Sequence, residues 1–71
     1  MYQTTVDTHI LDGRTYTAYG IAFQDIRIDD LSRDRETVDA LVELYNRRGL
    51  DPLHLREEVE DFLADQYQLL P

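Results

Sequence analysis

The stretch "THILDGRTYT", residues 8–17, decides the fold of this 71-residue chain. Asp12-Gly13 separates two runs rich in threonine, tyrosine and isoleucine, and this dipeptide is the strongest short signal for a two-residue hairpin turn. The sequence therefore predicts antiparallel strands at about residues 2–11 and 14–24. The turn also sets the register, because Leu11 must then face Arg14.

This register gives the hairpin two different faces, because side chains alternate along a strand. We expect the more apolar face to be the core; its cross-strand pairs are Tyr2 with Phe23, Thr4 with Ile21, Val6 with Tyr19, and Ile10 with Thr15. We expect the other face to be solvated, because its residues are polar or small: Gln3, Thr5, Asp7 and His9 opposite Ala22, Gly20, Ala18 and Tyr16.

A third, short strand is predicted at about residues 26–29, where Ile26 and Ile28 alternate around Arg27. A helix is predicted at about residues 33–48, with Ser32 or Asp34 as its N-cap and Gly49 in the left-handed position after its end. Its apolar residues recur at helical spacing, and Leu31 falls on the same stripe: Val38, Leu41, Val42 and Tyr45.

A second helix is predicted at about residues 52–66, because Asp51-Pro52 is a typical N-cap and first-turn pair. Its apolar side follows the i, i+4, i+7, i+8 pattern: Leu55, Val59, Phe62 and Leu63. The sequence thus predicts a single α+β domain over residues 1–71. It consists of an antiparallel hairpin with a short third strand, and of two helices packed on the side of Tyr19, Ile21 and Phe23.

Residues 31–64 resemble a family of short bacterial proteins of unknown function. The resemblance rests on "DLSRDRETV" (30–38), which fits the pattern D-x-S-x-D-R-E-x-V, and on "LDPLHL" (50–55), which fits L-x-P-x-H-L. The "YGI" at 19–21 fits less specifically. The resemblance implies a bacterial or mobile-element origin, and it brings no catalytic residues.

The composition excludes several classes of protein. Fifteen acidic and seven basic side chains give a net charge of −8, so the chain repels phosphate backbones and we expect no direct nucleic-acid binding. There is no cysteine and no lysine, which excludes disulfides, thiolate metal sites, Schiff-base chemistry and a P-loop. No run approaches the roughly 20 apolar residues of a membrane span, and no signal peptide is apparent. We expect a soluble cytoplasmic protein without a cofactor.

The acidic residues of the second helix form the strongest candidate site. They lie on the arc opposite its apolar stripe and follow one another closely: Glu57, Glu58, Glu60, Asp61 and Asp65. Such a surface suits a basic protein surface. It also argues against a DNA-binding helix-turn-helix, since the second helix of that motif must enter the major groove. His54 with Glu58, Asp61 and Asp65 has a spacing that a divalent cation could use, but one histidine beside solvated carboxylates is more often structural, and we predict no metal site.

Two further candidates lie on the hairpin. His9 and Tyr16 are predicted cross-strand neighbours, which indicates aromatic packing or a binding role, and no nucleophile accompanies them. Ala18, Gly20 and Ala22 form a small-residue surface that would admit another chain at close range.

These observations favour a small acidic, non-enzymatic interaction protein that binds a basic surface of a partner through its last helix. A sharper version is a phage or mobile-element inhibitor that mimics nucleic acid on a nucleic-acid-binding enzyme, as anti-CRISPR-like proteins do. The alternative is a self-associating structural protein that forms a homodimer through the small-residue sheet face.

Overall fold

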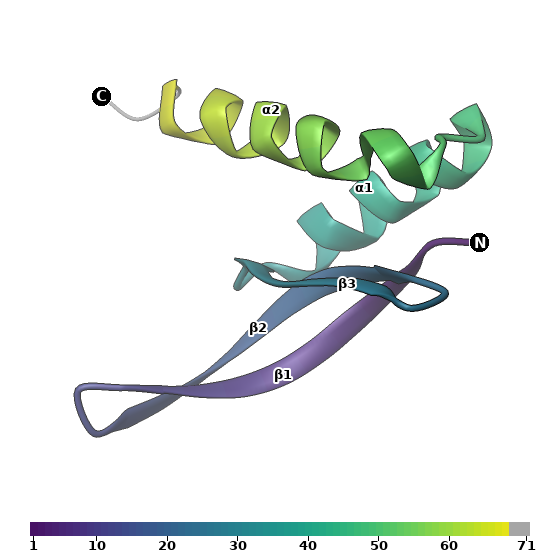
Figure 1. Cartoon of the computed structure of the whole chain (residues 1–71). Coiled ribbons are helices and arrows are strands. Elements are labelled where there is room, and N and C mark those ends of the chain that lie inside the picture. Colours follow the sequence, from purple (N-terminus) through teal and green to yellow (C-terminus); the bar gives the residue numbers. More distant parts are fainter. Residues whose placement is uncertain (69–71) are drawn as a thin grey trace.

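Three antiparallel strands form one sheet in the order β1-β2-β3, and two helices follow along the chain (Figure 1). The computed structural model describes residues 1–68. Its elements are β1 (Gln3–Leu11), β2 (Arg14–Phe23), β3 (Ile26–Ser32), α1 (Arg35–Arg48), a 3-10 turn η1 (Pro52–His54) and α2 (Leu55–Gln68). The predicted α+β arrangement is confirmed.

The hairpin has the register that its turn predicts. Leu11 pairs with Arg14, and the pairing continues without a shift to Gln3 opposite Ala22. Asp12 and Gly13 both have positive φ, 53° and 77°, as a type I′ turn requires. The turn dipeptide therefore fixes which side chains of the hairpin share a face.

β3 is longer than predicted, because it contains an irregularity that the sequence does not announce. Ile28 pairs with Ile21, but the next partner of β2, Tyr19, pairs with Ser32, so β3 carries extra residues between the two pairs. Asp30 lies in this bulge with a φ of 59°. The bulge also places Leu31, which falls on the stripe of the first predicted helix but before its start, in β3, where it is buried.

α1 begins two residues later than predicted, and its N-cap is Asp34. The Asp34 carboxylate accepts a hydrogen bond from the Glu36 amide at 3.2 Å, while Ser32 Oγ accepts one from the Asp34 amide at 3.0 Å. At the other end Leu50 N donates to Tyr45 O and Gly49 N to Asn46 O, with Gly49 at a φ of 62°. This is the predicted Schellman ending.

The second helix starts as a 3-10 turn. The Asp51 carboxylate accepts from the Leu53 amide at 3.0 Å, Pro52 to His54 form η1, and α2 continues from Leu55 to Gln68. The prediction of one helix over 52–66 was therefore wrong in its first turn, and α2 also runs two residues further.

The core lies between the sheet and the helices, with α1 next to the sheet and α2 as the outermost element (Figure 1). Its largest fully buried side chains come from β2, α1 and α2: Tyr45, Ile21, Leu55 and Val38. Tyr2 closes the core at the start of the chain, with its ring 4.7 Å from that of Phe23 and 5.8 Å from that of Tyr45.

The core occupies only one half of the predicted hairpin face, so that prediction was wrong for the half near the turn. Val6 and Ile10 are 60% and 76% exposed, and Figure 1 shows this end of the hairpin extending past both helices. A helix of 14 residues is about 21 Å long, whereas strands of this length reach about 30 Å, so helices of this length leave part of the hairpin uncovered.

The opposite sheet face is not an open, solvated surface, which corrects a second expectation. Ala18 is 1% exposed and Gly20 is buried. An ideal Cβ on Gly20 would collide with the Ile28 carbonyl oxygen and would lie 2.9 Å from both Asp29 Cα and Thr5 Oγ1. The backbone of the β3 bulge thus crosses close over this position, and the small residues leave room for it.

Candidate functional site

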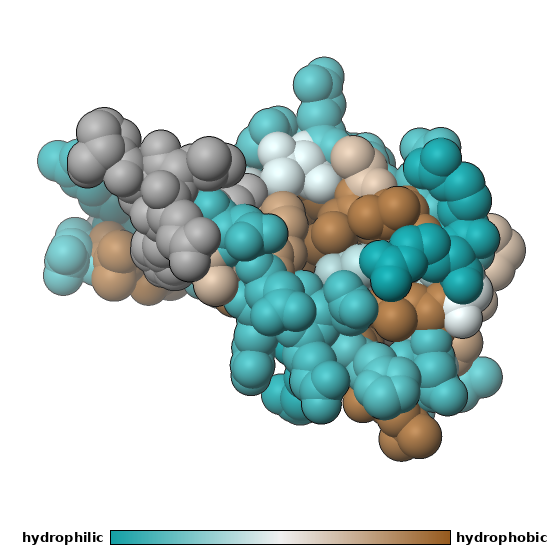
Figure 2. Space-filling view, turned by 90° about the horizontal axis from the view of Figure 1, so that it is seen from above, coloured by the Kyte–Doolittle hydropathy of each residue, from teal (hydrophilic) through white to brown (hydrophobic). Residues whose placement is uncertain are grey.

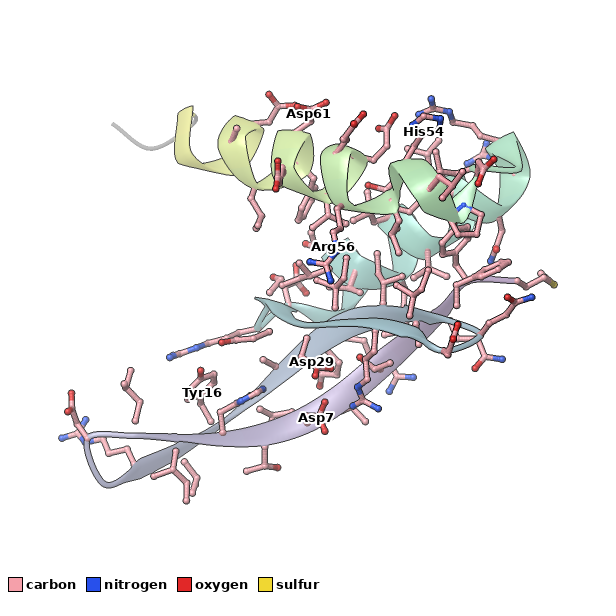
Figure 3. The ribbon with its side chains drawn as sticks, viewed as in Figure 1. Asp7, Tyr16, Asp29, His54, Arg56 and Asp61 are labelled. Atoms are coloured by element: carbon pink, nitrogen blue, oxygen red, sulfur yellow. The ribbon has the colours of Figure 1, made fainter. Side chains whose placement is uncertain are left out.

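The acidic residues of α2 occupy the arc of the helix opposite buried Leu55 and Val59. Four of them are exposed and Glu58 is half-buried: Glu57, Glu58, Glu60, Asp61 and Asp65. Figure 3 shows Asp61 and His54 on the side of α2 that points away from the sheet, whereas Arg56 points toward it. We call these five carboxylates the acidic face.

The basic side chains of the described residues compensate little of the negative charge of the acidic face. Arg48 Nη2 lies 3.8 Å from Glu58 Oε1, and His54 Nδ1 lies 3.8 Å from Glu57 Oε2. Exposed pairs at such distances contribute at most about 1 kcal/mol. Within residues 1–68, no basic side chain comes within ion-pair distance of Glu60, Asp61 or Asp65. The acidic face therefore presents net negative charge to the solvent.

The surface around the acidic face is mixed in hydropathy. Figure 2, which looks down on the molecule from the side of α2, shows hydrophilic residues over much of this surface and hydrophobic residues reaching it near the centre. Two leucines of the helical segments are exposed. Leu53, in η1, is 85% exposed, and Leu44, in α1, is 37% exposed. The side of the molecule on which α2 lies thus presents apolar area as well as charge.

His54 does not form the group with Glu58, Asp61 and Asp65 that binding of a divalent cation would require. His54 Nδ1 lies 3.8 Å from Glu57 Oε2, at i+3, and among the described residues it forms no ion pair with Glu58, Asp61 or Asp65. Over residues 1–68 there is no cluster of three or more histidine or acidic side chains arranged to hold a metal ion. His54 acts here as the partner of one carboxylate.

His9 and Tyr16 are neighbours, as predicted, and they belong to a larger cluster. Their rings stack with centroids 5.2 Å apart, and the Arg33 guanidinium lies 4.3 Å from the centroid of the Tyr16 ring. The Tyr16 hydroxyl donates to Asp30 Oδ2 at 3.0 Å, and this bond to a carboxylate raises the pKa of Tyr16. The arrangement fixes the end of β3 against the hairpin.

A second polar group on the same sheet face is centred on Arg27. Its guanidinium donates to Asp29 Oδ1 at 2.6 Å and to Asp7 Oδ2, so one cation holds two carboxylates. The bond from Arg27 lowers the pKa of Asp7. Figure 3 shows that Asp7 and Asp29 come from different strands of the sheet.

Sequence reasoning missed Asp30, Arg33 and Arg27 as members of these groups. Arg27 could have been found, because the alternation of Ile26 and Ile28 places it on the face of Asp7. Asp30 and Arg33 gave no such signal, because the third strand was predicted to end at about residue 29 and Arg33 was predicted on the first helix. The positive φ of Asp30 in the bulge interrupts the alternation of the strand.

The small-residue surface is not available to a second copy in the manner expected. Ala18 and Gly20 are buried, and the residues around them engage one another within the chain. Ala22 is half-buried. The premise of a flat, open face for homodimerisation was therefore wrong.

Comparisons with family models, with curated proteins and with solved structures gave no significant match. The resemblance to the family of short bacterial proteins stays an expectation on the quoted motifs. None of the described helices combines the length and the apolar character needed to cross a lipid bilayer.

Proposed function

We propose that this protein is a small, non-enzymatic interaction protein of the cytoplasm that binds a basic surface of a partner protein through the acidic face of α2. One observation carries the proposal: the carboxylates are segregated on the outward arc of the outermost helix, and the nearby basic side chains of the described residues, Arg48 and His54, reach only Glu58 and Glu57. Charges of both signs would serve solubility equally well, whereas this arc of α2 carries five acids and no basic residue.

The charge density of the acidic face supports a sharper form of the proposal. The five carboxylates from Glu57 to Asp65 span eight helical steps, which is about 12 Å at about 1.5 Å per residue. This corresponds to roughly one negative charge per 2.4 Å, against about one per 1.7 Å of duplex DNA. We propose that the partner is a nucleic-acid-binding enzyme and that the protein inhibits it as a phage or mobile-element product, as anti-CRISPR-like proteins do.

The residues of the sheet face support a non-enzymatic role. His9 and Tyr16 are held by stacking and by the bond to Asp30, while Ser32 serves the start of α1. These contacts give each side chain a structural task. His9 and Tyr16 remain predicted as secondary binding residues.

The test uses two variants that lose the same amount of charge. In the first, four carboxylates of the acidic face are replaced by amides: Glu57→Gln, Glu60→Gln, Asp61→Asn and Asp65→Asn. In the second, four exposed acids without hydrogen-bond partners among the described residues are replaced elsewhere: Asp12→Asn, Asp25→Asn, Glu36→Gln and Glu43→Gln. Each variant changes the net charge from −8 to −4.

The experiment measures binding of both variants, at increasing salt, to the protein that the wild-type chain retains most strongly from a bacterial extract. We expect the first variant to lose binding and the second to keep it, with a wild-type affinity that falls as ionic strength rises. Equal binding by both variants would remove the acidic face as the site. An equal loss of binding in both variants would mean that net charge, and not the acidic face, determines the binding.

A further inference from the structure

The outer edge of β1 is the longest backbone edge that the described structure leaves open. β1 pairs only with β2, so one side of it has no neighbouring strand. Leu11 and Arg14 flank a two-residue turn and form a hydrogen-bonded pair, and hydrogen-bonded pairs alternate along antiparallel strands. The even-numbered residues of β1 therefore direct their N–H and C=O groups outward: Thr4, Val6, Thr8 and Ile10.

One residue at the start of this edge is already hydrogen-bonded by the chain itself. The Tyr2 amide donates to Asn46 Oδ1 at 2.6 Å, and Asn46 Nδ2 donates to the Tyr2 carbonyl at 3.0 Å. The Asn46 side chain thus acts as a short substitute for a strand. From Thr4 to Ile10 the described structure contains no backbone partner on this side, and only the Thr4 hydroxyl is bound, to Asp39.

The two edges of the sheet differ in protection. Proteins usually guard edge strands with bulges, prolines or charges. β3 contains a bulge and the charged residues Arg27, Asp29 and Asp30. β1 has no proline and no bulge, its one acid, Asp7, is bound by Arg27, and Val6 and Ile10 stand exposed beside the open backbone. β1 therefore lacks the features that usually protect an edge strand from pairing.

The charge distribution favours a second copy of the chain as the occupant. Residues 3–23 carry only Asp7, Asp12 and Arg14, a net charge of −1, while the whole chain carries −8. Two copies that meet through this hairpin therefore bring together the least charged part of the surface. We propose that β1 pairs antiparallel with β1 of a second copy, centred on Thr8, to form a continuous six-stranded sheet. This inference does not depend on the acidic face.

The position of the centre follows from three constraints. Outward-pointing residues must pair with one another, which allows centres at Val6, Asp7, Thr8 or His9. A centre at Val6 would pair Ile10 with Tyr2 of the second copy, but Asn46 of the same copy already holds the backbone groups of Tyr2. A centre at Asp7 would oppose two like charges, and a centre at His9 leaves only residues 7–11 paired.

A centre at Thr8 satisfies all constraints and gives complementary pairs on both faces. Asp7 then stands opposite His9 of the second copy, so this register opposes no like charges. Val6 stands opposite Ile10 of the second copy, and the symmetry repeats both pairs. The four exposed apolar side chains come together at the centre of the new sheet.

The test compares two proline substitutions at one cross-strand pair. Thr8 and Thr17 face each other and are both exposed, and both direct their amides away from the hairpin. Thr8 does so on the β1 edge, and Thr17 on the other edge, beyond the part of β2 that β3 covers. Thr8→Pro removes a donor that the dimer needs, whereas Thr17→Pro is the matched control.

Sedimentation at micromolar to millimolar concentrations is expected to show a wild-type dimer. We expect the dissociation constant to rise about tenfold or more in Thr8→Pro and to stay within about twofold in Thr17→Pro. A monomeric wild type, a dimer unaffected by Thr8→Pro, or equal loss in both variants would overturn the proposal. A wild-type protein that is monomeric but pairs β1 with a strand of another protein would also overturn the proposal.

A cysteine experiment keeps the test decisive if Thr8→Pro does not fold. The chain has no cysteine, so each introduced thiol is alone. In the proposed register two copies of Thr8→Cys place their Cα atoms about 5.5 Å apart, within disulfide range. Two copies of Val6→Cys are about 13 Å apart, four residues along the strand. Mild oxidation should link the first variant into dimers and not the second; the reverse pattern would reject the register.

Discussion

Leu53 and Leu55 are two positions apart, yet one is 85% exposed and the other is completely buried. Both follow Pro52 at the start of the second helical segment, where two residues differ by about 200° around the axis. Leu55 therefore points into the core beside Tyr45 and Val59, while Leu53 points to solvent. The pair provides a measure of how firmly α2 is attached to the rest of the molecule.

Leu55→Ala should destabilise the protein much more than Leu53→Ala. Truncating a fully buried leucine costs about 2–5 kcal/mol, because it removes apolar contacts and leaves a cavity, whereas a change at an exposed leucine stays within about 0.5 kcal/mol. Urea unfolding monitored by circular dichroism measures both free energies. Similar midpoints for the two variants would mean that α2 is not docked through Leu55.

Gly20→Ala should destabilise the protein although alanine suits a strand better than glycine. The added methyl group would collide with the Ile28 carbonyl oxygen and with Asp29 Cα, which belong to the backbone and cannot rotate away. Overpacking of this kind costs about 1–3 kcal/mol. Thermal unfolding, with Ala22→Gly as a control that changes the same strand without adding volume, checks this. A Gly20→Ala variant as stable as the wild type would contradict the close approach of the bulge.

Asn46→Ala should lower the free energy of unfolding by about 1–3 kcal/mol, because it leaves the part-buried amide and carbonyl of Tyr2 without partners. Asn46→Asp is the informative comparison: it keeps the acceptor for the Tyr2 amide and replaces the donor by a carboxylate next to the Tyr2 carbonyl. We expect Asn46→Asp to be destabilised as well. Gln3→Ala, at an exposed neighbour on β1, is the control and should have little effect.

Alkaline pH should destabilise the protein through Tyr45. Burial raises the pKa of Tyr45 from 10.0 to about 12, so the folded state holds its proton more tightly than the unfolded state. The contribution is complete below pH 10 and is lost as the pH rises from 10 to 12. Urea midpoints across this range should fall less steeply in Tyr45→Phe, with a residual slope from Tyr2, whose pKa burial also raises. Identical slopes in wild type and Tyr45→Phe would contradict this assignment.

The local structure of this protein follows from short stretches of its sequence. Asp12-Gly13 gives the turn and with it the register of nine cross-strand pairs, and Gly49 gives the ending of α1. Asp51-Pro52 gives the next helical start. The acidic face was also predictable, because the period of a helix sorts Glu57, Asp61 and Asp65 away from Leu55. In each case the decisive interactions join residues a few positions apart, so a short stretch of sequence is enough to predict the structure.

Tertiary structure decided the features that depend on contacts between distant segments. Whether Val6 and Ile10 are covered depends on how far the helices reach along the hairpin. The alternation of apolar and polar residues in the strands does not predict that distance. The bulge in β3 places Leu31 in the sheet and brings Asp30 to Tyr16, because extra residues between two cross-strand pairs interrupt the alternation at that point. Arg33 follows the strand and lies over the same tyrosine ring. Asn46 is hydrogen-bonded to Tyr2, 44 residues away in the sequence. Only the tertiary structure shows that the open edge of β1 begins directly after this contact.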